Sequence, residues 1–69
     1  MINFKYEIGM IVEDIELGTE YKIIDKYIQK DGYTDKAYYV IKPTWDELEE
    51  PIMISELILS LKFEIKIKK

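Results

Sequence analysis

The 69-residue chain contains no cysteine, no histidine and no arginine. Without cysteine it forms no disulfide and offers no thiolate to a metal, and without histidine it lacks the imidazole that relays protons near pH 7. Zinc fingers, serine–histidine or cysteine–histidine catalysis and thiol redox motifs are therefore excluded. The absence of arginine removes the planar group that binds guanine or phosphate through two parallel hydrogen bonds. We expect a protein that is not an enzyme and that carries no cofactor or metal.

Long apolar runs are also missing from the sequence. No segment approaches the roughly 20 consecutive apolar residues that a membrane-spanning helix needs. The N-terminal segment MINFKYEIG lacks the charged and then apolar order of a signal peptide. We therefore expect a soluble cytoplasmic protein with no membrane partner, located in the host cytoplasm if a phage encodes it. Because a chain of this length folds as one domain, residues 1–69 are expected to form a single domain.

The residues that are abundant favour β-strands. Taken together, isoleucine, valine, threonine and the aromatic residues make up a large share of the chain, whereas alanine occurs once. Residues that interrupt strands recur at short intervals, at Gly9, Gly18, Asp31-Gly32, Pro43 and Pro51. Short strands separated by regularly spaced turns are typical of a small barrel or sandwich. The sequence therefore predicts an all-β fold.

The alternation of apolar and polar residues predicts five strands, at residues 10–14, 19–29, 36–42, 52–55 and 61–68. In the second strand the apolar face changes between Ile23 and Ile24, which indicates a β-bulge or a sharp bend. The dipeptide Asp31-Gly32 suits the positive φ angles of a hairpin turn between the second and third strands.

Two short turns are expected after the third strand. Thr44 and Glu47 have the spacing of a capping box, which predicts at most one helical turn. Ser55 is expected to cap a single 3₁₀ turn that places Leu57 or Ile58 on the core. The alternative is a helix over residues 48–61, although the proline and the β-branched residues within that range oppose it.

Three segments carry a resemblance to a known family: residues 6–12, 18–25 and 52–57. Together they look like the layout aromatic-x-x-Gly-x-x-Val, Gly-x-x-Tyr-x-Val and Val-x-Glu-x-x-Leu of small bacterial and bacteriophage SH3-like β-barrel proteins. The resemblance implies a five-stranded SH3-like barrel with a short 3₁₀ turn before the last strand. It also suggests an accessory protein of a phage or another mobile element.

The sequence departs from the SH3-like proteins of known ligand. Tyr38 and Tyr39 stand where polyproline-binding SH3 domains carry a pair of tryptophans, and the proline and tyrosine near the 3₁₀ turn are missing. The first loop contains Glu13, Asp14 and Glu16, where RNA-binding barrels of ribosomal and transcription proteins have a basic loop. The resemblance therefore implies a fold and neither of these functions.

Charge divides unevenly along the chain. Residues 1–56 hold six lysines and thirteen acidic residues, a net charge of −7, whereas residues 57–69 hold four lysines and one glutamate, a net charge of +3. One segment of the acidic part combines an aromatic anchor with carboxylates: Trp45, Asp46, Glu47, Glu49 and Glu50. Tryptophan is enriched at binding hot spots, and clustered charge steers the encounter with an oppositely charged surface.

From this segment we expect a non-catalytic protein-interaction module that docks its acidic, tryptophan-bearing loop on a basic surface of a protein partner. In the other interpretation, Trp45 covers one end of the barrel and the carboxylates are only solvated.

A second hypothesis is a weak RNA- or DNA-binding barrel that uses the basic last strand and a platform of tyrosines. Its candidate residues are Lys62, Lys66, Lys68, Tyr27, Tyr33 and Tyr38. The acidic body opposes nucleic acid, and such residues commonly serve as the solvated face of an edge strand and as cross-strand packing partners. A third hypothesis is a homo-oligomer whose edge strands pair, since the sequence leaves the oligomeric state open.

Overall fold

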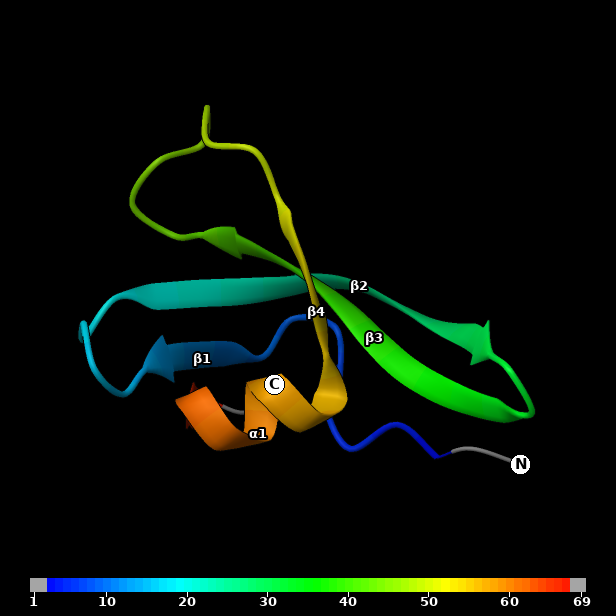
Figure 1. Ribbon diagram of the computed structural model, residues 1–69. Helices are drawn as coiled ribbons and strands as arrows, with labels where there is room; N and C mark the ends of the chain where they lie inside the picture. Colours follow the sequence, from blue (N-terminus) through cyan, green and yellow to red (C-terminus); the bar gives the residue numbers. More distant parts are fainter. Residues whose placement is uncertain (1–2, 68–69) are drawn as a thin grey trace.

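The computed structural model describes residues 3–67, which form a five-stranded antiparallel sheet and one short helix (Figure 1). The elements are β1 (Ile11–Asp14), β2 (Glu20–Asp31), β3 (Thr34–Pro43), β4 (Ile52–Ser55), α1 (Glu56–Lys62) and β5 (Phe63–Ile67). The strand order is β4-β3-β2-β1-β5. The all-β class is thus confirmed. Within residues 3–67 no ladder joins the edge strands β4 and β5, so the sheet is open and a closed barrel is not confirmed.

Within the described residues, no helix is long and apolar enough to cross a membrane.

A β-bulge divides β2 into two halves. Ile23 lies opposite Ile41 on β3 and Asp25 lies opposite Val40, so Ile24 is an extra residue on β2. An extra residue bends its strand and changes the face on which the following side chains lie. The first half of β2 therefore pairs with both β1 and β3, and the second half forms a long hairpin with β3. The predicted change of phase between Ile23 and Ile24 is confirmed.

The hairpin turn consists of Gly32 and Tyr33, because Asp31 pairs with Thr34. Gly32 has a φ of 67°, and no non-glycine residue in the described part of the chain has a positive φ. A positive φ at the first central position alone is the pattern of a type II′ turn, which matches the twist of the flanking strands. The predicted hairpin is therefore confirmed, but its central residues are Gly32 and Tyr33 rather than the predicted Asp31 and Gly32.

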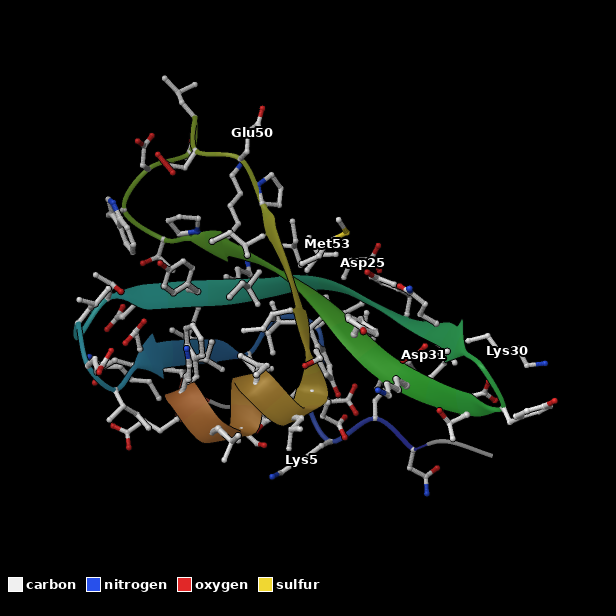
Figure 2. All side chains as sticks on the ribbon, in the orientation of Figure 1. Lys5, Asp25, Lys30, Asp31, Glu50 and Met53 are labelled. Carbon is white, nitrogen blue, oxygen red and sulfur yellow. The ribbon has the colours of Figure 1, made fainter. Side chains whose placement is uncertain are left out.

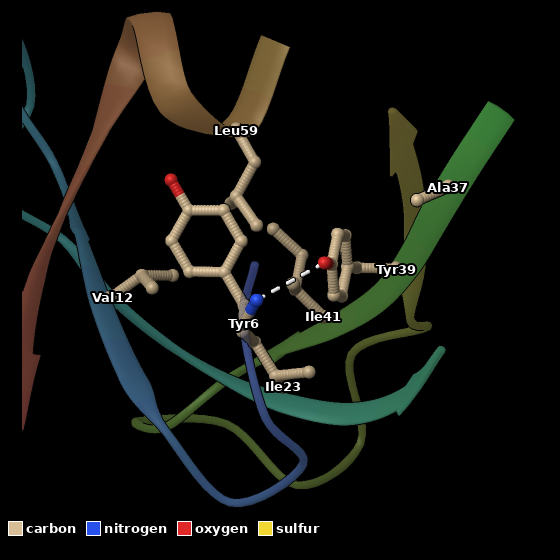
Figure 3. Close-up of a cluster of buried hydrophobic side chains, with 7 residues drawn as sticks. All are labelled: Tyr6, Val12, Ile23, Ala37, Tyr39, Ile41 and Leu59. Atoms are coloured by element: carbon tan, nitrogen blue, oxygen red, sulfur yellow. Dashed lines mark hydrogen bonds between the residues drawn. The ribbon is translucent and has the colours of Figure 1, made fainter. Parts of the chain in front are cut away.

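The core lies on one face of the sheet and is covered by α1 and the N-terminal segment (Figure 3). Tyr39 is fully buried at its centre, and the rings of Phe4 and Tyr6 meet it edge-on at centroid distances of 5.9 and 5.4 Å. The buried set is Tyr6, Val12, Ile23, Ala37, Tyr39, Ile41 and Leu59. Every strand except β4 and β5 contributes to it.

The segment before β5 is an α-helix of seven residues, which corrects the expected 3₁₀ turn. The hydroxyl of Ser55 accepts a hydrogen bond from the backbone N–H of Ile58, so the predicted cap is confirmed. The helix continues through Leu61 and Lys62, which the alternation pattern had assigned to the last strand. The core residue of this segment is Leu59, and the prediction of Leu57 or Ile58 is wrong.

The reason lies in the first helical residue, Glu56. Its carboxylate accepts hydrogen bonds from the hydroxyl of Tyr39 and from the backbone N–H of Lys5, the latter at 3.0 Å. Residues three apart share one face of a helix, so fixing Glu56 against the core directs Leu59 inward. The Tyr39 hydroxyl also accepts the backbone N–H of Tyr6 at 3.1 Å, a contact drawn in Figure 3. This network joins the N-terminal segment, β3 and α1.

We predict that Leu59→Ala lowers the free energy of unfolding by about 3 kcal/mol, because it empties a fully buried site. Leu57→Ala, on the exposed side of the same helix, is the matched control and should change it by less than about 0.5 kcal/mol. Urea unfolding measures both values. Equal losses for the two variants would contradict the helical phase described here.

We also predict a loss of stability at alkaline pH that depends on Tyr39. Burial, and then the hydrogen bond to Glu56, raise the pKa of this phenol above its ordinary value of 10. Since the unfolded chain releases this proton at lower pH than the folded chain, the contribution is complete below pH 10 and is lost as the pH rises above it.

Tyr39→Phe tests both the network and its pH dependence. It should cost about 1–3 kcal/mol at neutral pH, because the N–H of Tyr6 and the carboxylate of Glu56 each lose a partner. Above pH 10 the difference between wild type and variant should shrink. Tyr38→Phe is the control, since within residues 3–67 its hydroxyl makes no hydrogen bond. A difference that stays constant between pH 8 and pH 11 in urea unfolding contradicts the account.

Candidate functional site

Residues 44–51 join β3 to β4 and are hereafter the acidic loop. The loop projects at the top of the view in Figure 1, whereas α1 lies at the bottom. Figure 2 shows Glu50 in this loop, far from Lys30 and Asp31 at the end of the β2–β3 hairpin. All five residues predicted to bind a protein partner, Trp45, Asp46, Glu47, Glu49 and Glu50, lie within it.

The loop consists of bends and a turn without a helix, which is within the expectation of at most one helical turn, but the capping box predicted at Thr44 and Glu47 does not form. Thr44 cannot serve as its cap, because its hydroxyl donates to the Glu20 carbonyl at 3.3 Å. Asp46 organises the loop in its place. Its carboxylate accepts the N–H of Leu48 at 2.9 Å, and its carbonyl accepts the N–H of Glu49 at 3.4 Å. The start of the loop is thereby tied to β2, and its middle closes an internal turn.

Trp45 is half packed and half exposed. Its ring meets Tyr21 edge-on at a centroid distance of 5.4 Å, and Tyr21 meets Phe63 at 5.6 Å. The side chain nevertheless keeps 57% of its surface in contact with solvent. Trp45 therefore combines the two interpretations: one side of its ring packs on the scaffold, and the other side is available to a partner. A ring held on one side by the scaffold loses less conformational entropy when its other side binds.

Leu48 is the residue of this site that the sequence analysis missed. It is 94% exposed at the loop, between Glu47 and Glu49. The available signal was a large apolar side chain between charged residues. Because its neighbours in the sequence are charged and remain in water, such a side chain is expected to be exposed with them. Leu48 and Trp45 are the two large hydrophobic side chains of the acidic loop, and both are exposed.

The carboxylates of the acidic loop are not neutralised within the part of the chain that the structure describes. The ion pairs there involve Glu7, Glu13, Glu20 and Asp31, and none involves the loop. Four carboxylates within five residues add their fields at distances shorter than the Debye length of about 8 Å at physiological salt. The loop therefore presents a negative field around two apolar side chains.

Two lysines lie at the base of the loop. Lys22 on β2 and Lys42 on β3 are opposite each other in the sheet, and both line an open hollow of about 450 Å³ together with Ile24, Pro43, Thr44 and Glu47. Neither lysine comes within ion-pair distance of a carboxylate in residues 3–67. The negative field of the loop is thus concentrated at its outer part.

The two lysines of the nucleic-acid hypothesis that the structure describes, Lys62 and Lys66, lie on different elements. Lys66 on β5 forms ion pairs with Glu20 and with Glu13, the latter at 3.0 Å. These two hydrogen bonds, Glu20 first, raise the pKa of Lys66 above its ordinary value. Lys62 lies in the last turn of α1, and Lys68 lies outside the described residues. Lys66 thus serves a structural pairing on the outer face of the sheet.

The three candidate tyrosines are also divided. Tyr27 and Tyr38 stack on each other across β2 and β3, with ring centroids 5.6 Å apart and an angle of 15° between the rings. The hydroxyl of Tyr27 also contacts the sulfur of Met53 at 3.4 Å. Tyr33 stands alone and fully exposed in the hairpin turn. In two of the three rings, one face is therefore occupied by the other ring and is not available to stack on a base.

Comparison of the chain with models of protein families, with curated proteins and with solved structures finds no match.

Proposed function

We propose that the protein is a non-catalytic interaction module and that its acidic loop docks on a basic surface of a protein partner. One observation carries the proposal. Trp45 and Leu48 are exposed within the same six-residue segment as four carboxylates, and these carboxylates have no cation partner in residues 3–67. At 94%, Leu48 is the most exposed leucine of the residues that the structure describes.

The two kinds of side chain have different roles in this mechanism. The carboxylates of Glu47, Glu49 and Glu50 attract a basic surface and raise the rate of association. Leu48 and the free side of Trp45 then lose contact with water, which stabilises the complex by about 25 cal/mol for each Å² of apolar surface buried. Binding is thus fast because of charge and lasting because of apolar contact.

The scaffold presents the loop in one conformation. Tyr21 holds the ring of Trp45, the Glu20 carbonyl holds Thr44, and Asp46 closes the turn ahead of Leu48. A loop ordered before binding keeps more of its interaction energy as affinity. The resemblance to small SH3-like proteins of bacteria and bacteriophages supports a partner that is a host protein or a viral protein.

We predict that Glu47→Lys/Glu49→Lys lowers the capture of the partner from a lysate of the native host by about tenfold or more. The control variant Glu16→Lys/Asp35→Lys has the same formal charge but reverses two exposed carboxylates outside the acidic loop, and its capture should stay at the wild-type level. Partner capture that is unchanged in the loop variant refutes the proposed mechanism.

A second pair of variants tests the apolar contact. Leu48→Ala should weaken binding of the captured partner, measured by calorimetry, by about tenfold, as expected of a hot-spot residue. Leu17→Ala, which shortens another exposed leucine in the β1–β2 loop, should leave the affinity unchanged. Equal effects of the two variants would count against the acidic loop as the docking site.

The same preparation distinguishes the nucleic-acid hypothesis. We expect no gel shift with mixed-sequence RNA or DNA at about 50 mM salt, a condition that favours contacts to phosphate. A shift that is abolished by Lys66→Gln would favour nucleic acid over a protein partner.

A further inference from the structure

The outer edge of β5 is open. On one side β5 pairs with β1, and on the other side no strand pairs with it within residues 3–67. Ile65 lies opposite the fully buried Val12, yet it is 37% exposed, and Ile67 is 55% exposed. Ile65 lies on the core-facing side of the sheet and remains exposed because the core layer ends at β5, whereas Ile67 lies opposite Ile11, beyond an irregularity in the register. An open edge of this kind is a template for another strand.

The outer face of the sheet has an unbalanced row of charges that ends at the same edge. Glu20 on β2, Glu13 on β1 and Glu64 on β5 lie directly opposite one another across the three strands. Lys66 is ion-paired with Glu13 and Glu20. Glu64 has no ion pair in the part of the chain that the structure describes. Like charges on directly opposed residues destabilise a sheet, so a cation beside Glu64 would relieve this row.

We propose that a second copy of this chain fills the open edge by antiparallel pairing of β5 with β5, centred on Ile65. In this register Glu64 of each copy lies opposite Lys66 of the other, and the same pair occurs twice because of the two-fold axis. The core-facing pair at the centre is Ile65 with Ile65. The sheet then continues across both copies, with charges on its outer face and apolar residues on its core face.

The sequence of β5 selects this register over its neighbours. An antiparallel pair centred on Glu64 would oppose two glutamates, and one centred on Lys66 would oppose two lysines. A shift of a single residue would place charged side chains on the core face, because successive residues of a strand lie on opposite faces. Among these registers, only the pairing centred on Ile65 matches both charge and face.

Lys66 has the capacity for this second role. Its ammonium group has three N–H donors, of which Glu13 and Glu20 use two. The side chain also keeps 47% of its surface exposed. The third donor is therefore free to meet Glu64 of the second copy.

The pairing is expected to be weak. It joins five residues of each copy, whereas a standard protein interface of roughly 1,600 Å² involves about 20–30 residues on each side. The dimer should therefore form at micromolar or higher protein concentration and should be seen by sedimentation over a wide concentration range. The inference does not depend on the acidic loop.

Disulfide trapping tests the register directly, since the chain has no cysteine of its own. Opposed residues of an antiparallel pair have Cα atoms about 4.5–5.5 Å apart, which is within the range that a disulfide spans. Under mild oxidation, Ile65→Cys should form a covalent dimer at least about ten times faster than the control Leu48→Cys, whose exposed thiol reports random collisions. Equal rates would overturn the proposal, as would faster trapping of Glu64→Cys or Lys66→Cys.

Charge reversal provides an independent test. Glu64→Lys makes the outer face of β5 uniformly positive, and Lys66→Glu makes it uniformly negative, so each variant alone should sediment as a monomer. An equal mixture should form a heterodimer, because every glutamate then meets a lysine. Circular dichroism checks that each variant folds. If Lys66→Glu does not fold, the disulfide trapping of Ile65→Cys still tests the pairing. Self-association of Glu64→Lys at the wild-type level would contradict the pairing.

Discussion

The carboxylate of Glu56 and the hydroxyl of Tyr39 form the contact on which the rest of the structure depends. Through them, the backbone of Lys5 and Tyr6, the centre of β3 and the first turn of α1 are tied to one point in the core. This contact sets the phase of α1, and the phase of α1 decides that Leu59 enters the core. The helix in turn fixes where β5 begins and which of its residues face inward.

The features that the sequence predicted correctly are those that local patterns determine. The bulge after Ile23, the turn at Gly32 and the cap at Ser55 each follow from two or three neighbouring residues. The helix and the burial of Leu59 were missed, because they depend on a contact between residues 17 positions apart. The alternation of apolar and polar residues begins at Leu61, two residues before β5. It therefore predicts the start of this strand too early.

The candidate site shows the same division. A local run of carboxylates beside Trp45 was sufficient to locate the acidic loop, and its composition also contained the signal for Leu48. The lysine hypothesis lost support because strand register places Lys66 beside Glu13, a residue 53 positions away in the chain. Such a partner cannot be recognised from the spacing of lysines alone. If β5 pairs as proposed, each dimer carries two acidic loops, and two linked sites bind a partner with paired sites more tightly than one.

The central claim is that Trp45 lies exposed in a negative field, and the fluorescence of this single tryptophan tests it most directly. Caesium ions and iodide ions both quench an exposed indole, but the carboxylates of the acidic loop should attract caesium and repel iodide. We expect quenching by caesium to exceed quenching by iodide at low salt, with the difference shrinking as salt screens the charges. A blue-shifted emission that neither ion quenches would contradict the account.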